Sequence, residues 1–311
     1  MALSPRVPAR NLQPVFARFA LAVLIVVLLL LVAWNPVAAD TNQIEIRSNL
    51  VYRQVGGQYL ALDAYLPMAV LPAGTPVPAT ARSVVVVIHG GGWVGGDKAD
   101  EHREYISRAL AQDGFVVISV NYRLAPDHVF PAAIDDVKAA VAWLRQPAQV
   151  ASLGIDPARI GVLGDSSGAQ LAGLLGSIGS GPLDRGSRVS VVVSLAGPMS
   201  FTTDLAEAGS ANSVLMFLGC AAAIPCPSRK DASPITYVDP SDPPYLLVNG
   251  ADDPVVRPAQ SVLMGKALDQ VGVANEVLIP PISAHGSDLF HDAGVAKATI
   301  VFLHRYLDAA T

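Results

Sequence analysis

A short glycine-framed segment contains the clearest candidate for a nucleophile. Residues 164–168 read Gly-Asp-Ser-Ser-Gly and match G-x-S-x-G, in which a strand turns sharply into a helix and exposes a serine hydroxyl at the bend. Glycines suit so tight a turn because a Cβ at either position would strike the neighbouring strand or helix. The apolar run 159–163 favours a buried strand before the turn, and 169–175 favours a helix after it. We therefore expect Ser166 to be a nucleophile.

A serine hydroxyl needs a histidine to take its proton, and the sequence offers three candidates. On this type of sheet the acid and then the histidine follow the serine along the chain, which leaves His285, His291 and His304. His304 lies within a helical pattern at 295–307 and is interpreted as structural. His285 follows the apolar run 277–280 in a loop at a strand end, where catalytic residues of open α/β sheets gather. We therefore favour His285 over His291 as the base.

The acid that orients the histidine should follow the strand expected at 245–248. Asp252 and Asp253 both stand there, and neighbouring loop residues point in different directions, so only one of them can reach the imidazole. Either could instead be a turn or helix-capping residue, because Asp before Pro commonly begins a helix. The residues alone leave this choice open.

A glycine-rich segment offers donors for the negative charge that develops on an attacked carbonyl. His-Gly-Gly-Gly-Trp at 89–93 directly follows a valine-rich strand expected at 83–88. Consecutive glycines let backbone N–H groups turn toward such a charge, although the same residues suit a flexible turn. HGGG upstream of G-x-S-x-G is a specific pairing for an oxyanion hole. We expect its donors to be the N–H groups of Gly91, Gly92 and Ser167.

Strand and helix patterns alternate from residue 42 onward, which predicts an α/β fold with a largely parallel sheet covered on both faces. A hairpin is expected before the first of these units, with Gly56 and Gly57 at its bend. Residues 198–240 interrupt the alternation and should form a small excursion over one end of the sheet. The expected strands are 43–53, 58–66, 83–88, 115–121, 159–163, 188–195 and 245–248, and the expected helices are 100–112, 131–144, 169–175, 256–271 and 295–307.

The first 39 residues form a separate unit. Residues 1–18 hold three arginines and no acidic residue, and residues 19–34 are uncharged and almost wholly apolar. Small residues before position 40 complete a secretory signal, with cleavage expected after Ala39. An uncleaved membrane anchor through 19–34 is the alternative. The domains are therefore predicted as a signal peptide or anchor at 1–39 and a catalytic domain at 40–311, secreted or in the cell envelope.

The two cysteines and the overall composition further limit the kind of protein that this chain can be. Cys220 and Cys226 are six residues apart, and in an exported protein a short disulfide is favoured over two free thiols. Hydrophobic residues make up 51% of the chain and charged residues 15%, with a formal net charge of −5 and no extended basic cluster. This composition argues against a disordered or nucleic-acid-binding protein. No histidine stands near the cysteines, so no metal site is expected there.

Several ordered segments resemble the α/β-hydrolase carboxylesterases, and among them the hormone-sensitive-lipase-like esterases. The resemblance runs from HGGGW at 89–93 through 122–136 and 154–168 to 232–256. It implies ester hydrolysis without a metal or organic cofactor, on a small-molecule ester. The family pattern G-x-x-D-x-x-V falls on Gly250, Asp253 and Val256, which selects Asp253 as the acid.

The chain departs from that family in three places. Asn249 stands where the family often has histidine before glycine, and His285 lies in Ser-Ala-His-Gly-Ser rather than in a fuller glycine-framed motif. The helical N-terminal cap of many relatives is replaced by a short hairpin, so the cap is small or absent. A more open site with little apolar lid should favour short acyl groups.

The sequence thus predicts an exported serine carboxylesterase that hydrolyses short-chain esters through an acyl-enzyme. Two alternatives stay open: a serine peptidase or amidase that uses the same triad, and a non-catalytic binding module on a hydrolase scaffold.

Overall fold

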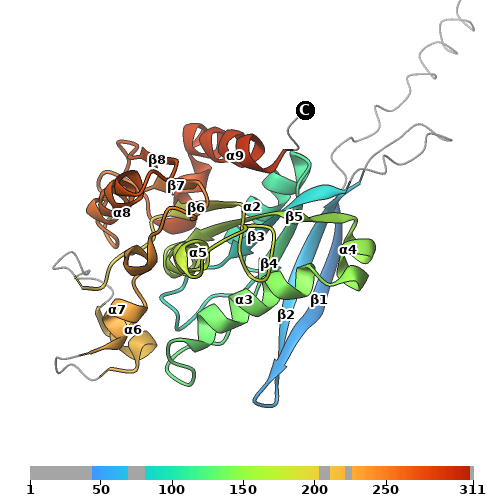
Figure 1. Ribbon diagram of the computed structural model, residues 1–311, viewed down its shortest axis with the longest axis horizontal. Helices are drawn as coiled ribbons and strands as arrows, with labels where there is room; N and C mark the ends of the chain where they lie inside the picture. Colours follow the sequence, from blue (N-terminus) through green and yellow to red (C-terminus); the bar gives the residue numbers. More distant parts are fainter. Residues whose placement is uncertain (1–43, 69–80, 203–210, 221–225, 309–311) are drawn as a thin grey trace, which may run out of the picture. The chain divides into compact units, whose positions relative to one another are not determined.

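The computed structural model describes residues 44–68, 81–202, 211–220 and 226–308 (Figure 1). The predicted signal peptide or anchor lies outside these residues. The described chain forms one eight-stranded sheet in the order β1-β2-β4-β3-β5-β6-β7-β8. Neighbouring strands from β4 to β8 pair in parallel, whereas β1 and β2 pair antiparallel with each other and β2 with β4. The strands are β1 (Ile44–Val55), β2 (Gln58–Pro67), β3 (Arg82–Ile88), β4 (Val116–Val120), β5 (Ile155–Asp165), β6 (Val191–Leu195), β7 (Tyr245–Val248) and β8 (Asn275–Leu278).

Helices cover both faces of this sheet, as the alternating pattern predicted. Figure 1 shows α3 and α5 on one side of the sheet and α9 on the other. The α/β-hydrolase architecture expected from the sequence is thereby confirmed. The helices are α2 (Glu101–Gln112), α3 (Ala132–Leu144), α4 (Pro147–Leu153), α5 (Ser167–Ser177), α6 (Ala211–Leu218), α7 (Ser228–Asp231), α8 (Ala259–Gln270) and α9 (Ala293–Leu307), with 3₁₀ turns η1 (Pro234–Tyr237) and η2 (Gly286–His291).

The valine run of β3 shows why the sheet must be covered on both faces. Val84 and Val86 join the core beneath α3 and α5, whereas Val85 and Val87 join the core beneath α2 and α9. All four side chains are fully buried. Because successive side chains of a strand point to opposite faces, a run of valines is stable only between two helical layers.

The N-terminal hairpin bends at Gly56 and Gly57, as predicted, and both have positive φ angles of 56° and 78°. The sequence suggested that this hairpin stands in the place of the helical cap of many relatives, but in the structure it is part of the central sheet. The hairpin lengthens the sheet itself, since Leu62 of β2 lies opposite Val120 of β4 in an antiparallel pair. It therefore forms the sheet's edge and does not take the place of a cap.

The segment that interrupts the alternation contains α6, α7 and η1. Its two cysteines, Cys220 and Cys226, are joined by the predicted disulfide, with Cα atoms 5.9 Å apart. On α6, Phe217 stacks against Trp93, with ring centroids 4.5 Å apart. This contact places α6 beside the glycine-rich segment at 89–93. Within the described residues, no helix combines the length and the apolar character that crossing a membrane requires.

One helix starts later than predicted because a side chain accepts a hydrogen bond from a backbone amide that was expected to lie in the helix. Helix α8 begins at Ala259 and not at Val256, because the amide of Val256 donates to the Asp253 carboxylate and Pro258 stands at the helix start. The short helix α4 was not expected at all.

His304 on α9 is held between two carboxylates, which agrees with its interpretation as structural. Its imidazole pairs with Asp308 on its own helix and with Asp113 at the end of α2. Burial disfavours the charged form, but the hydrogen bonds to both carboxylates outweigh it and raise the pKa of His304. The contact between His304 and Asp113 thus ties α9 to the C-terminal end of α2.

Candidate active site

Ser166 occupies a strained turn between β5 and α5. Its φ of 52° and ψ of −119° are unusual for a residue with a side chain, and its amide is held by the carbonyl of Leu195, 2.8 Å away. A Cβ on Gly164 would lie 2.2 Å from the carbonyl oxygen of Gly168, and one on Gly168 would lie 2.2 Å from that of Ile88. Both glycines are therefore required for the turn, as the sequence predicted.

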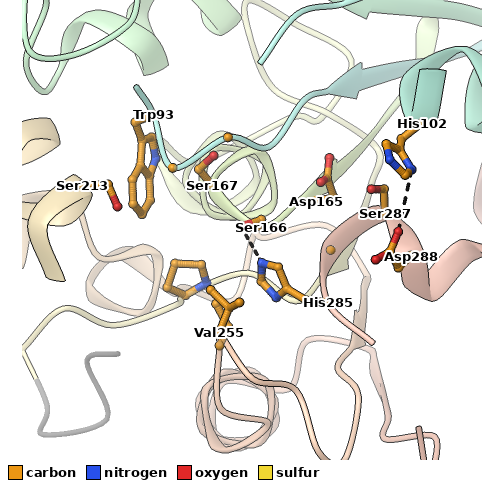
Figure 2. Close-up of a pocket in the computed structure, with 15 residues that line it drawn as sticks. Trp93, His102, Asp165, Ser166, Ser167, Ser213, Val255, His285, Ser287 and Asp288 are labelled. Carbon is orange, nitrogen blue, oxygen red and sulfur yellow. Dashed lines mark hydrogen bonds and ion pairs between the residues drawn. The ribbon is translucent and has the colours of Figure 1, made fainter. Parts of the chain in front are cut away.

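The imidazole of His285 lies between the serine and an aspartate. Its Nε2 is 2.8 Å from Oγ of Ser166, and its Nδ1 is 2.9 Å from Oδ2 of Asp253. Figure 2 shows the ring pointing at Ser166. The side chain of His285 is 20% exposed, whereas that of Asp253 is fully buried. The structure thus brings together the three residues expected from the sequence and leaves His291 and Asp252 out of the group.

The Asp253 carboxylate is fixed by backbone amides as well as by the imidazole. Oδ1 accepts hydrogen bonds from the amides of Val255 and Val256 at 2.8 and 2.9 Å. Asp252 faces outward, and its backbone carbonyl accepts from the hydroxyl of Ser283. The geometry therefore distinguishes the two adjacent aspartates that the sequence left open.

Asn249 is a functional neighbour that the sequence did not reveal. Its Nδ2 donates to Oδ2 of Asp253 at 3.1 Å and to the carbonyl of Val256 at 2.9 Å. Its Oδ1 accepts from the hydroxyl of Ser261, and the side chain is fully buried. From the sequence, this position is only a departure from the histidine that the family often has there. In the structure, this position supports the aspartate directly.

Two loops are joined by backbone hydrogen bonds that set the spacing between Asp253 and His285. The amide of Ala251 donates to the carbonyl of Pro280 at 2.9 Å, and that of Asp252 donates to Ile282 at 3.3 Å. These bonds continue the pairing of β7 with β8 beyond the strand ends. The carboxylate and the imidazole are therefore placed by the sheet and not by the loops alone.

The predicted oxyanion donors lie around one cavity with the serine. Gly91, Gly92 and Ser167 line a cavity of about 450 Å³ together with Ser166. Trp93 forms another part of its wall, where the indole Nε1 donates to Oε1 of Gln170 on α5 at 2.9 Å. The glycine segment is thereby tied to the helix that begins at the serine.

A buried ion pair lies beside Ser166. Arg103 of α2 pairs with Asp165, the residue before Ser166, and both side chains are almost fully buried. The carboxylate also accepts from the amide of Gly90 at 3.0 Å, and Nη2 of Arg103 donates to Oγ of Ser287 at 3.0 Å. Burial lowers the pKa of Arg103 from its usual high value. One guanidinium thus links α2, the serine turn and the loop that carries the histidine.

A serine, a histidine and an aspartate at the carboxyl ends of β5, β8 and β7 are the arrangement of a serine hydrolase on an α/β-hydrolase sheet. The family model BD-FAE matches residues 69–268, more than half of the 311 residues. The chain therefore belongs to the BD-FAE family of α/β-hydrolase esterases, which agrees with the resemblance to hormone-sensitive-lipase-like carboxylesterases.

Individual proteins support this assignment. The chain is 33% identical over 205 residues to Esterase LipQ of Mycobacterium tuberculosis, covering 63% of this chain and 48% of that protein. The chain thus spans about half the length of that curated relative. A truncated carbohydrate esterase from gut microbiota superposes with a TM-score of 0.71 at 25% identity, over 87% of this chain and 99% of that one. An acetyl ester-xyloside bifunctional hydrolase from Caldicellulosiruptor lactoaceticus superposes with a TM-score of 0.67 at 25% identity, over 83% and 94%.

Proposed function

We propose that this protein is an exported serine carboxylesterase that hydrolyses short-chain esters through an acyl-enzyme. The observation that carries the proposal is the continuous contact from Ser166 Oγ to His285 Nε2 at 2.8 Å and from His285 Nδ1 to Asp253 at 2.9 Å. Membership of an esterase family supports the reaction class.

In the first step Ser166 Oγ attacks the ester carbonyl carbon while His285 Nε2 takes the hydroxyl proton. Asp253 holds the ring by Nδ1–H and stabilises the imidazolium that forms. The carbonyl oxygen becomes an oxyanion, and the N–H groups of Gly91 and Gly92, with that of Ser167, are the donors we assign to it. The imidazolium then gives its proton to the departing alcohol oxygen, which leaves an acyl-serine.

In the second step a water molecule replaces the alcohol. His285 takes a proton from the water as its oxygen attacks the acyl carbon, and the same amides receive the second oxyanion. Collapse of this intermediate returns the proton to Ser166 Oγ and releases the carboxylic acid. The two half-reactions consume one ester and one water and leave the protein unchanged.

Hydrolysis of p-nitrophenyl acetate and butyrate by Ser166→Ala tests this mechanism. We expect loss of about 10³-fold or more in kcat because the nucleophile is removed. Ser180→Ala, which changes an exposed serine, is the matched control and should keep the parent rate. A fluorophosphonate should add its mass to Ser166 in the parent protein. Equal rates for parent and Ser166→Ala would refute the mechanism, and absence of the adduct would favour a binding module.

The preference for short acyl groups is supported by the size of the cavity and by its walls. At about 450 Å³ the cavity is modest, and Trp93 and Ser213 stand on one side of Ser166 (Figure 2). Two structural neighbours are a carbohydrate esterase and an acetyl ester-xyloside bifunctional hydrolase. We therefore propose acetyl esters, including those of sugars, as the substrate class. A series of p-nitrophenyl esters from two to ten carbons, beside acetylated xylo-oligosaccharides, tests it; a preference for the longest chains would contradict it.

Export rests on residues 1–39, whose pattern is that of a secretory signal. The Cys220–Cys226 disulfide agrees with an oxidising compartment. We expect the secreted protein to begin at Asp40, which N-terminal sequencing of the product will test. A chain retained in the membrane fraction with residues 19–34 intact would instead support the anchor.

A further inference from the structure

Three potential metal ligands gather at the edge of the active-site cavity. His102 comes from the first turn of α2, whereas Asp288 and His291 come from η2, directly after the catalytic histidine. Their ligating atoms all lie within 4.8 Å of one another. No local pattern of residues indicates this group, because nearly two hundred residues separate His102 from Asp288 along the chain.

The local backbone explains why Asp288 and His291 point the same way. In a 3₁₀ helix, which has about three residues per turn, side chains at i and i+3 lie in line. Asp288 and His291 have this spacing within η2. His102 Nδ1 approaches Asp288 Oδ1 to 3.7 Å, a contact that Figure 2 shows as a dashed line. In a tetrahedral site with bonds of about 2.0–2.2 Å, ligand atoms lie about 3.3–3.6 Å apart. Small side-chain rotations would therefore bring all three onto one ion.

Contacts on both sides of the group hold its two elements together. Tyr105, one turn after His102 on α2, stacks on His291 with ring centroids 4.5 Å apart. The buried Arg103 of the same helix donates to Ser287 of η2 at 3.0 Å. The imidazole of His291 is thus oriented by an aromatic ring, and the separation of α2 from η2 is fixed beneath the exposed ligands. This arrangement lowers the ordering cost of binding an ion.

We propose that His102, Asp288 and His291 form a site for a divalent transition-metal ion, with Zn²⁺ as the representative, and that its occupancy slows ester hydrolysis. Two imidazoles and one carboxylate suit such ions better than Mg²⁺ or Ca²⁺, which prefer oxygen ligands. His102 and Asp288 line the same cavity as Ser166 and His285. A bound ion with its remaining water ligands narrows that side of the cavity and ties η2, which begins beside His285, to α2.

Binding is tested first, by isothermal titration of the protein with ZnCl₂. We expect one ion per chain, and His291→Gln and Asp288→Asn should each weaken binding about tenfold or more, as loss of even an outer-shell partner costs about 10–100-fold. His128→Gln removes an imidazole outside the group and is the matched control. Circular dichroism and thermal melting of each variant establish that it is folded. No saturable binding by the parent, or undiminished binding by both folded variants, would overturn the site.

The catalytic imidazole is the competing ligand for zinc, and one variant distinguishes it. His285→Gln should retain zinc binding if the ion lies on η2 and α2. Binding that disappears in His285→Gln but persists in His291→Gln would overturn the proposal and place the ion on the triad. This comparison does not depend on any esterase activity.

The effect on turnover rests on the proposed esterase function and is measured separately. Saturating Zn²⁺ should lower kcat/KM of the parent for p-nitrophenyl acetate, and EDTA should restore it. His291→Gln, compared with its own metal-free rate, should lose this inhibition at the same concentration. If zinc binds the group but the parent rate is unchanged, the inhibitory role is wrong while the site stands. If the metal-free parent hydrolyses no ester, the proposed function fails and the titration still decides the site.

Discussion

Asp253→Asn is the sharpest test of how the candidate triad is oriented. Oδ1 of the aspartate accepts from two backbone amides, and Oδ2 accepts from Nδ2 of Asn249 while both oxygens face Nδ1 of His285. An asparagine of the same shape keeps its oxygen toward the two amides, because an NH₂ there would face two backbone donors, whereas at the other position it faces one, Asn249 Nδ2. Its NH₂ group then faces His285 Nδ1, which has to become an acceptor. The imidazole is forced into the tautomer that carries its proton on Nε2, where it cannot take one from Ser166.

The magnitude follows from this change of tautomer. Loss of a triad aspartate by the same substitution in other serine hydrolases lowers kcat by about 10⁴-fold. The buried donors around Asp253 leave little room for reorientation, so we expect a fall of about 10³–10⁴-fold in kcat. That fall corresponds to about 4–5.5 kcal/mol of transition-state stabilisation.

Steady-state hydrolysis of p-nitrophenyl acetate measures this effect, with Asp252→Asn as the matched control. Asp252 is the neighbouring, exposed aspartate and carries the same charge change, so its variant should keep kcat within about twofold. Near-UV circular dichroism of both variants checks that the fold is retained. A fall of less than tenfold for Asp253→Asn, or equal falls for the two variants, would refute the tautomer argument.

Three further predictions concern stability. Arg103→Met leaves its buried carboxylate partner unpaired and should lower the free energy of unfolding by about 3–5 kcal/mol, as urea denaturation will show. Replacing Cys220 and Cys226 by serine should cost about 2 kcal/mol in the same assay, because the bond closes a short loop. The raised pKa of His304 means that its stabilisation is fully present below about pH 6.5 and is lost as pH rises through its folded pKa. The stability difference between the parent and His304→Gln should therefore shrink with rising pH; a difference that grows would contradict the carboxylate clamp.

The fold and the centre of the site were predictable because each depends on short-range patterns. The valine run at 83–88 requires burial on two faces, and G-x-S-x-G can adopt its turn only with glycines at both ends. The order of serine, acid and histidine along an α/β sheet then restricted the base to a few residues. The first two constraints act within a few residues of the chain, and the third needs only the order of residue types along it, so all three can be inferred from the sequence alone.

The surroundings of the site depend on contacts between distant segments and were not predictable. Arg103 looks like any basic residue of an amphipathic helix. Only the structure, in which α2 packs against β4 and β2, shows that its guanidinium reaches Asp165 at the end of β5. Asn249 differs from the family pattern by one residue type, and nothing local reveals that its amide reaches Asp253. The start of α8 was misjudged for a related reason, since the carboxylate takes the amides that a helix would otherwise use.

His285, the proposed catalytic base, follows β8, which is an edge strand of the sheet and is short. β8 spans only Asn275–Leu278 and pairs on one side alone, with β7. The free energy of local unfolding is lowest at such sheet edges, where few backbone amides are protected from exchange with solvent. We expect fraying at this edge to separate His285 from Ser166 while the central strands stay intact. On heating, esterase activity should therefore be lost at a lower temperature than the one at which the fold unfolds. Residual activity then reports on the edge strand β8, and circular dichroism reports on the central strands.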